Sequence, residues 1–249
     1  MALALSGRLW VCISTHESEP TFFYLILVAA AAGTARFIFT NRQAAPPHTV
    51  ASRVAQFGDA VRARLLPAFE RAGINYPPAA ITLVAIKDQK SLEVYATQAG
   101  GRPVAVCSYP VLGASGGPGP KLREGDLQVP EGVYAVENLN PNSRFHLALR
   151  VNYPNPHDRL RAREENRSNL GSDIMIHGGA ASIGCLAMGD RAAEDLFVLA
   201  ALAGIGNVTL IFTPTDFRKN PGFEIPPGAP AWTGALYEEI KRELKPLAP

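Results

Sequence analysis

The stretch IMIHGGAASIGCLAM, from Ile174 to Met188, places a histidine and a cysteine eight residues apart with little except small residues between them. The alternating residues before His177 indicate a strand that ends at the histidine, and Gly178 and Gly179 allow a tight turn or the close approach of another backbone. A buried core favours bulk at such positions, whereas a reactive site favours small residues because a substrate must come close to the backbone. The stretch therefore predicts a strand and a tight loop that carry a candidate site.

The composition favours one globular domain with many turns. The chain has 249 residues, 47% of them hydrophobic and 18% charged, which suffices for one domain with appendages and a sizeable core. Its 22 glycines and 21 prolines favour short strands over a helical bundle. The net charge of +2, without a long run of lysine or arginine, gives nucleic-acid binding little support. Because metal-ligand spacings such as CxxC or HExxH are absent, we expect no metal and no other cofactor.

Residues 1–48 are expected to form a signal or anchor segment followed by a linker. The apolar run FFYLILVAAAAG, residues 22–33, is short for a membrane span and suits the core of a signal peptide. The acidic residues Glu17 and Glu19 before it are atypical of a signal peptide. An uncleaved membrane anchor and a buried structural helix therefore stay open as alternatives. The segment NRQAAPPH, residues 41–48, has the composition of a linker.

Helical patterns flank the rest of the chain. Residues 49–78 form an N-terminal helical region, which Thr49 opens, Pro67 breaks or restarts, and Gly73 ends. A second helix follows the cysteine and begins at Asp190, which is expected to cap it.

Strand patterns dominate residues 79–214, and residues 215–249 form a C-terminal tail with a short helix over 235–244. The seven strand patterns are AITLVAIKD, SLEVYAT, RPVAVCSYPVLGAS, GVYAVENL, RFHLALRVNY, SDIMIHG and NVTLIF. The sequence thus predicts a mainly β fold, a β-sandwich or barrel-like domain. An N-terminal helix, one helix after the cysteine and a C-terminal helix complete it.

The residue types of the opening stretch suit nucleophilic catalysis. Cys185 immediately precedes the Asp190 helix, so the helix dipole and free amides are expected to stabilise its thiolate, and His177 can accept the thiol proton. The amides of Gly184 and Cys185 are candidates to face a developing oxyanion. From spacing alone, a buried inert cysteine beside a hydrogen-bonded strand-end histidine is an equally good interpretation. Cys107 is expected to be a small apolar filler, and a disulfide between it and Cys185 stays open.

The segment IHGGAASIGCLAMGD resembles the active-site motif of the L,D-transpeptidase (YkuD/ErfK) catalytic domain family. The similarity is to the branch with a short loop between histidine and cysteine, the YafK-like murein L,D-transpeptidases. It continues upstream in YPVLGASGGPGPKLREGDLQVPEGVY, LNPNSRFHLALRVNYPNPHDR and LGSDIMIHGG, and spans about residues 81–218. The resemblance implies that residues 79–214 are a β-rich catalytic domain outside the cytoplasmic membrane, in the periplasm or cell envelope.

The resemblance also implies a reaction and its partners. In this family the cysteine attacks the amide that follows the third residue, a diamino acid, of a peptidoglycan stem tetrapeptide, and D-alanine leaves. The acyl-enzyme then passes to an amine, which gives a cross-link between two third residues or an attached wall protein. By position, Cys185 is the nucleophile, His177 the general base and acid, and the carbonyl of Gly178 orients the imidazole. Ser182 and Gly184 match the small residues before the cysteine and are expected at the substrate.

Two positions depart from the wider family. Ala187 stands where most members have an arginine two residues after the cysteine, and Ile183 stands where many have a histidine two residues before it. The family arginine is expected to hold a substrate carboxylate, so its absence opens the question of what replaces it. The candidates are Arg150, Arg159 and Arg167, and a solvated surface arginine is the alternative for each.

Other polar residues have weaker assignments. His146 alternates with apolar neighbours and is a candidate to line the substrate cleft, with a strand-surface histidine as the alternative. Asp126 and residues 153–155 are expected to build turns that shape the cleft. Glu131 is expected to cap a turn, and His157 to lie exposed in a loop beside prolines.

Three functions remain open. The first is an L,D-transpeptidase. The second keeps the same acyl-enzyme and resolves it with water, as a peptidoglycan amidase or carboxypeptidase. The third is a non-catalytic wall-binding domain, which the intact pair of His177 and Cys185 disfavours. A papain-like protease would need its cysteine early in the domain and its histidine much later, the reverse of this order.

Overall fold

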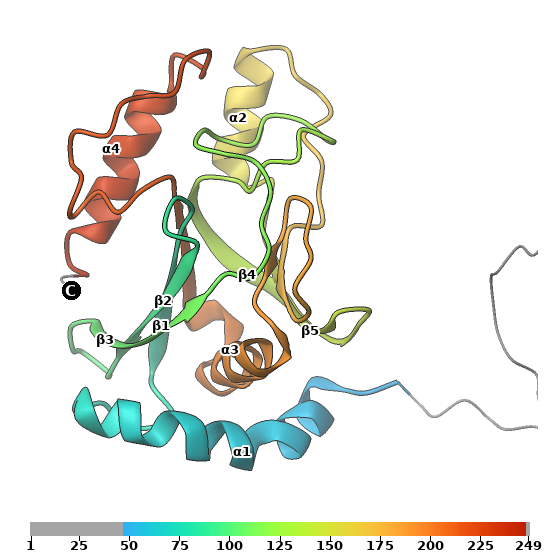
Figure 1. Ribbon diagram of the computed structural model, residues 1–249, viewed down its shortest axis with the longest axis vertical. Coiled ribbons are helices and arrows are strands. Elements are labelled where there is room, and N and C mark those ends of the chain that lie inside the picture. The colour runs from blue at the N-terminus through green and yellow to red at the C-terminus, as the bar shows by residue number, and fades with distance from the viewer. Residues whose placement is uncertain (1–46, 248–249) are drawn as a thin grey trace, which may run out of the picture. The chain divides into compact units, whose positions relative to one another are not determined.

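The structure is a computed structural model that describes residues 47–247 (Figure 1). Its elements, in chain order, are α1 (Val50–Arg71), β1 (Ala80–Ile86), β2 (Ser91–Thr97), β3 (Val104–Pro110), β4 (Gly132–Ser143), β5 (His146–Val151), α2 (Pro156–Glu164), β6 (Met175–His177), β7 (Leu186–Ala187), α3 (Asp190–Ala203), the 3-10 turn η1 (Ile205–Asn207), β8 (Val208–Thr213) and α4 (Thr233–Leu244). The predicted signal or anchor run over residues 22–33 lies outside this range. Within it, no helix has both the length and the hydrophobicity that crossing a membrane requires.

The eight strands form one sheet in the order β3-β2-β1-β8-β4-β5-β6-β7. The pairs β1–β8 and β6–β7 are parallel, and all other neighbours are antiparallel. The domain is therefore mainly β with an N-terminal, a central and a C-terminal helix, which confirms the predicted fold class. All seven predicted strands are present, and the eighth, the two-residue β7, was missed because two residues carry no periodic pattern.

Strand β1 shows how the sequence builds the core. Its residues Leu83 and Ala85 belong to the cluster formed with α1 and α3, whereas Val84 and Ile86 belong to the cluster formed with α4. Successive side chains of a strand point to opposite faces, so an uninterrupted apolar run fits a strand covered on both sides. Burying a leucine, valine or isoleucine side chain in this way contributes about 1.5–3 kcal/mol. Figure 1 shows α1 and α3 lying close together, with α4 packed elsewhere on the sheet.

Helix α1 begins as the sequence predicts and continues further than expected. The Thr49 hydroxyl accepts a hydrogen bond from the Ser52 amide at 3.0 Å, in a capping box. The helix runs through Pro67 without interruption, so the expected break there is wrong. Proline removes one backbone donor, and burial of the adjacent turn, including Phe69, against the core offsets that loss. Gly73, with φ of +67°, follows the end of the helix.

Helix α2 was not predicted, and His157 lies in it rather than in a loop. The side chains of Asn155 and Asp158 form a capping box at its start. The mean hydropathy of its residues is strongly polar. No apolar stripe marks such a helix, which explains the miss. The side chain of His157 is exposed, as expected.

The two cysteines in the described part of the chain are both free thiols. Cys107 lies in β3, the edge strand of the sheet, and is partly buried against the main core cluster. It fills space next to the core, as expected, but is not fully buried. The disulfide to Cys185 that the sequence left open is not formed.

Candidate active site

The histidine and the cysteine of the motif come together because β6 and β7 pair in parallel. His177 is aligned with Ala187, and the amide of Met188 donates to the carbonyl of His177 at 2.8 Å. The loop between the two strands therefore brings the chain back beside the end of β6. Cys185, the residue before β7, lies against β6, and the amide of Met175 donates to its Sγ at 3.3 Å.

The imidazole of His177 is held in one tautomer. The ring is buried, and its Nδ1 lies 2.6 Å from the carbonyl oxygen of Gly178. A carbonyl can only accept, so Nδ1 carries the hydrogen and donates it. In the neutral ring Nε2 then has the free lone pair, and it lies 3.4 Å from the hydroxyl oxygen of Ser182. Nε2 is therefore the ring atom that can accept a proton.

An aromatic ring covers the imidazole. Phe145, in the turn between β4 and β5, has its ring centroid 4.7 Å from that of His177, with 32° between the ring planes. Contacts of this kind contribute about 0.5–1.5 kcal/mol beyond area burial. Phe145 is itself 52% exposed, so it forms part of the outer wall of the site. The sequence placed Phe145 in the predicted strand RFHLALRVNY and gave no sign that it would reach the histidine, because that contact joins residues distant in the chain.

The thiol of Cys185 is protonated and half-buried. Its Sγ donates to the carbonyl of Asp173 at 3.4 Å, and a carbonyl accepts only from a group that still has its hydrogen. Burial raises the pKa of Cys185 above its ordinary value, and the hydrogen bonds from the Met175 amide and from Ser182 act in the opposite direction. Ser182 thus contacts both the thiol and Nε2 of His177.

The expected stabilisation of the thiolate by the helix N-terminus does not match the structure. Strand β7 separates Cys185 from α3, and the amide of Gly184 donates to the Ser115 hydroxyl at 2.7 Å instead of facing an oxyanion. Asp190 is the first residue of α3 rather than its cap, and its carboxylate accepts from the amide of Gly179 at 2.8 Å. Dipole effects fall off within the first turn, so burial dominates at the thiol.

The raised pKa predicts a slow, strongly pH-dependent thiol in the free protein. A neutral thiol is a poor nucleophile, so alkylation of Cys185 by iodoacetamide is expected to accelerate with pH and to reach half its maximum rate above pH 9.0, the ordinary value. Intact-mass measurement of the Cys107→Ala variant reports the rate without a competing thiol among the described residues. A rate that is already at its maximum at neutral pH would contradict the dominance of burial.

Glycine is required at position 178 because a side chain there would clash with its neighbours, and not because the backbone angles demand glycine. A Cβ atom there would lie 2.6 Å from the Phe145 carbonyl oxygen and 2.6 Å from an Asp190 carboxylate oxygen. Gly178→Ala is therefore expected to displace the carbonyl that orients the imidazole and to reduce turnover by about 10²-fold. Gly206→Ala is the matched control, because its Cβ would meet no atom within 4 Å. Equal turnover of the two variants would show that the Gly178 carbonyl need not be held in place.

A match between a family model and most of the folded chain identifies the family. Residues 80–231, more than half of the sequence, match the model of the YkuD family, the L,D-transpeptidase catalytic domain. The chain belongs to the L,D-transpeptidase family.

Similar proteins cover parts of this L,D-transpeptidase chain. YafK of Escherichia coli strain K12, a provisionally assigned L,D-transpeptidase, is 37% identical over 113 residues, which are 45% of this chain and 43% of YafK. The helical cell shape determining protein Pgp2 of Campylobacter jejuni is 21% identical, with a TM-score of 0.45, over 55% of this chain and 48% of Pgp2. Bd1075 of Bdellovibrio bacteriovorus is 20% identical, with a TM-score of 0.39, over 67% and 56%. The chain thus spans less than half the length of the curated relatives it matches.

The position of the missing family arginine is closed in this L,D-transpeptidase domain. Ala187 is fully buried, and its amide donates to the Gly113 carbonyl at 2.8 Å. The amide of Leu112 donates back to the Ala187 carbonyl at 2.9 Å. The backbone of residues 112–113 therefore covers this end of β7, and position 187 carries no charged side chain. Ile183, at the other departure, is 74% exposed.

Two residues predicted to bind substrate have protein partners of their own. Arg167 pairs with Glu165 at 2.6 Å and donates to the Leu122 carbonyl at 2.8 Å. His146 directs Nε2 to a carboxylate oxygen of Glu194 in α3 at 3.1 Å. Among the described residues neither side chain has a hydrogen bond to the histidine or cysteine of the motif. Their roles at the substrate remain predictions.

Asp126 and Glu131 lie in turns as predicted, and Glu131 also links distant parts of the chain. Asp126 accepts from the amides of its neighbours in the turn and pairs with Lys121 at 2.6 Å, which confirms the expected turn, while its role in shaping the cleft stays a prediction. Glu131 accepts from the Gly119 amide, as a capping residue does. It also pairs with the buried Lys87 at 2.9 Å and accepts from Tyr237 of α4 at 3.0 Å. Glu131 thus ties the C-terminal helix to the loop that leads to the site.

Proposed function

We propose that this domain is a peptidoglycan L,D-transpeptidase in which Cys185 takes the acyl group of a stem tetrapeptide and passes it to an amine. Family membership supports the class of activity. The observation that carries the assignment to residues is the tautomer of His177. Its Nδ1 is committed to the Gly178 carbonyl, so Nε2 is free to act as a base, and Ser182 contacts both Nε2 and the thiol.

In the first half-reaction, Nε2 of His177 takes the proton of Cys185 as Sγ attacks the carbonyl carbon of the third residue. A carbon–sulfur bond forms, and the amide bond to the fourth residue breaks. The imidazolium gives its proton to the leaving amine, and D-alanine departs with it. General acid–base assistance of this kind contributes about 10²–10⁴-fold. Because the thiol is neutral at rest, we propose that proton transfer accompanies substrate attack instead of preceding it.

In the second half-reaction, an amine attacks the thioester carbonyl. His177 removes a proton from the amine, the carbon–sulfur bond breaks, and Cys185 recovers its hydrogen. The product is a cross-link between two third residues or a protein attached to the wall. Water in place of the amine would give a free tripeptide, the product of a carboxypeptidase or amidase.

We further propose that the chain is exported and acts on peptidoglycan stem peptides in the cell envelope. Transpeptidases of this class need access to the wall, and the apolar run over residues 22–33 has the composition of an export signal. Membrane anchoring by that run is the alternative to cleavage. The amine acceptor is a second stem peptide or a wall-attached protein.

The decisive experiment is digestion of purified sacculi with the protein, followed by mass spectrometry of the released muropeptides. Transpeptidation is expected to give dimers joined through two third residues, with loss of D-alanine. Tripeptides without dimers would assign hydrolysis instead. If neither product appears while Cys185 remains unmodified, the proposed function is wrong.

A further inference from the structure

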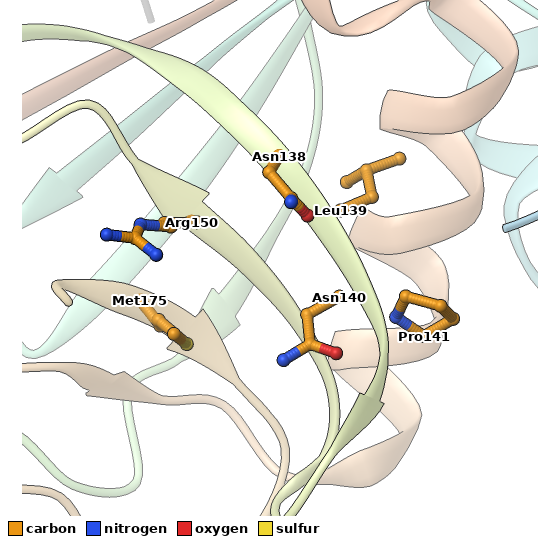
Figure 2. A pocket seen from close by; sticks show the side chains of 6 residues that line it. All are labelled: Asn138, Leu139, Asn140, Pro141, Arg150 and Met175. Atoms are coloured by element: carbon orange, nitrogen blue, oxygen red, sulfur yellow. The ribbon is translucent and has the colours of Figure 1, made fainter. Parts of the chain in front are cut away.

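The turn between β4 and β5 is held only in part by the pairing of the two strands. Figure 2 shows these strands side by side, along a pocket of about 320 Å³ that Asn140 and Arg150 help to line. Asn140 is aligned with Ala148, but the register shifts before Ser143 pairs with His146. His146 also has φ of +71°, a left-handed conformation that a residue other than glycine keeps only where its surroundings fix it. Contacts outside the strand pairing are therefore needed to hold this turn.

The ring of His146 supplies such contacts from the helices α1 and α3. Its Nε2 lies 3.1 Å from a carboxylate oxygen of Glu194 in α3. It also packs edge-on against Phe57 of α1, with ring centroids 5.3 Å apart and 67° between the ring planes. The other oxygen of Glu194 pairs with Arg64 of α1 at 3.0 Å, and the side chains of His146 and Glu194 are 24% and 16% exposed. Because the carboxylate is already ordered by a second partner, little further entropy is lost when the histidine binds to it.

The residue before His146 covers the imidazole of His177. The ring of Phe145 lies against that imidazole, and the backbone of the two turn residues packs directly on Gly178. A Cβ atom added to Gly178 would lie 2.6 Å from the Phe145 carbonyl oxygen and 3.0 Å from Cβ of His146. The amide of Gly178 donates to the carbonyl of Leu147 at 3.1 Å. A displacement of His146 therefore moves both the ring over the imidazole and the backbone beside the carbonyl that binds its Nδ1.

We propose, resting on the proposed function, that His146 is a positioning residue that acts on His177 through Phe145. The contact with Glu194 fixes the β4–β5 turn to α3, and the turn holds the Phe145 ring against the imidazole. The ring shields one side of the imidazole, which is only 3% exposed, and keeps Nδ1 on the Gly178 carbonyl. Nε2 then stays free to take the proton of the thiol. His146 thus contributes to the reaction without touching the substrate.

The first test measures the cover over His177 and needs no substrate. Diethyl pyrocarbonate modifies unprotonated imidazoles, and peptide mass mapping reports the rate at His177 relative to the exposed His157 of the same chain. His146→Asn keeps a side chain that tolerates the left-handed backbone but is too short to reach Glu194. At fixed pH it is expected to raise the relative rate about tenfold, as the loss of one aromatic contact predicts. Phe145→Ala is expected to raise the rate by the same factor.

Two further substitutions separate this contact from the general stability of the helices. Glu194→Gln keeps a polar partner for His146 and is expected to keep His177 covered, whereas Glu194→Ala is expected to match His146→Asn. Tyr109→Phe removes a hydrogen bond of 3.0 Å from β3 to Asp195, the next residue of α3, and is expected to leave the rate at His177 unchanged. Thermal unfolding of each variant shows that the rates are measured on folded protein.

Turnover then tests the coupling between the two turn residues. His146→Asn and Phe145→Ala are each expected to lower kcat for D-alanine release about tenfold, because the imidazole is no longer held in place. The double variant is expected to be no slower than Phe145→Ala alone, since His146 then has no ring to position. Losses that multiply, an unchanged reaction of His177 with diethyl pyrocarbonate in His146→Asn, or an equal gain in Tyr109→Phe would overturn the proposal. Absence of D-alanine release by the unmodified protein, with the cover still dependent on His146, would overturn the proposed function and leave the contact.

Discussion

Replacing Cys185 with alanine is expected to abolish turnover, with a loss of at least about 10³-fold, because the acyl group then has no sulfur to receive it. The fold is expected to persist. The hydrogen bonds of the Cys185 side chain among the described residues are to neutral groups, namely the Met175 amide, the Asp173 carbonyl and Ser182. Bonds of this kind contribute about 1 kcal/mol each. The measurement is D-alanine release from sacculi or from tetrapeptides, together with thermal unfolding.

Cys107→Ala is the matched control, since it removes the other described thiol from an edge strand. It is expected to retain turnover. Cys185→Ser is expected to be nearly inactive, because a hydroxyl has a far higher pKa than a thiol and gives a much weaker nucleophile at neutral pH. Turnover by Cys185→Ala close to that of the unmodified protein would mean that another group carries the acyl chain.

Replacing His177 with alanine is expected to reduce turnover by about 10²–10⁴-fold, the usual contribution of a general base. The structure adds a pH dependence. Because burial raises the pKa of the Cys185 thiol, the sulfur stays protonated at neutral pH unless a base removes its hydrogen. As pH rises through that pKa, solvent removes the hydrogen instead. The deficit of the variant in acylation is therefore expected to shrink in alkaline solution, which is measured as the rate of acyl-enzyme formation across pH.

His157→Ala controls for loss of an imidazole, since His157 is exposed on α2. It is expected to behave as the unmodified protein does at every pH. A deficit in His177→Ala that stays constant from neutral to alkaline pH would argue for a structural role of the ring instead of proton transfer.

Local patterns were sufficient to predict most of the fold. Alternating and continuous apolar runs indicated seven of the eight strands, and helical periodicity indicated three of the four α-helices. The misses share a cause. Helix α2 is mostly polar, with no apolar stripe, and β7 is two residues long, so neither has a periodicity to detect. Pro67 was wrongly expected to break α1, because core packing around it outweighed the local cost.

The surroundings of the thiol were beyond the reach of local patterns. Spacing and residue type identified His177 and Cys185 as a pair, and the resemblance supplied their roles. Neither indicated that the hydroxyl of Ser115, 69 positions earlier in the chain, would accept a hydrogen bond from the amide of Gly184. Nor did they indicate that Phe145 would cover the imidazole. The sequence suggested a thiolate stabilised by a helix, and the structure has a thiol whose pKa is raised by burial.

By itself, the sequence determined the class of fold, the family and the residues that can carry out the chemistry, because hydrophobic period, small-residue loops and nucleophile type are properties of short segments. Only the tertiary structure decided that burial raises the pKa of Cys185, that Phe145 covers the imidazole of His177, and that Ser182 contacts both side chains. Arg150 illustrates the difference. Sequence made it one of three equal candidates, and strand pairing with Met175 placed it beside the residue whose amide donates to Sγ of Cys185. A pKa and a contact between side chains depend on burial and on partners that are distant in the chain, and the folded backbone alone brings those partners together.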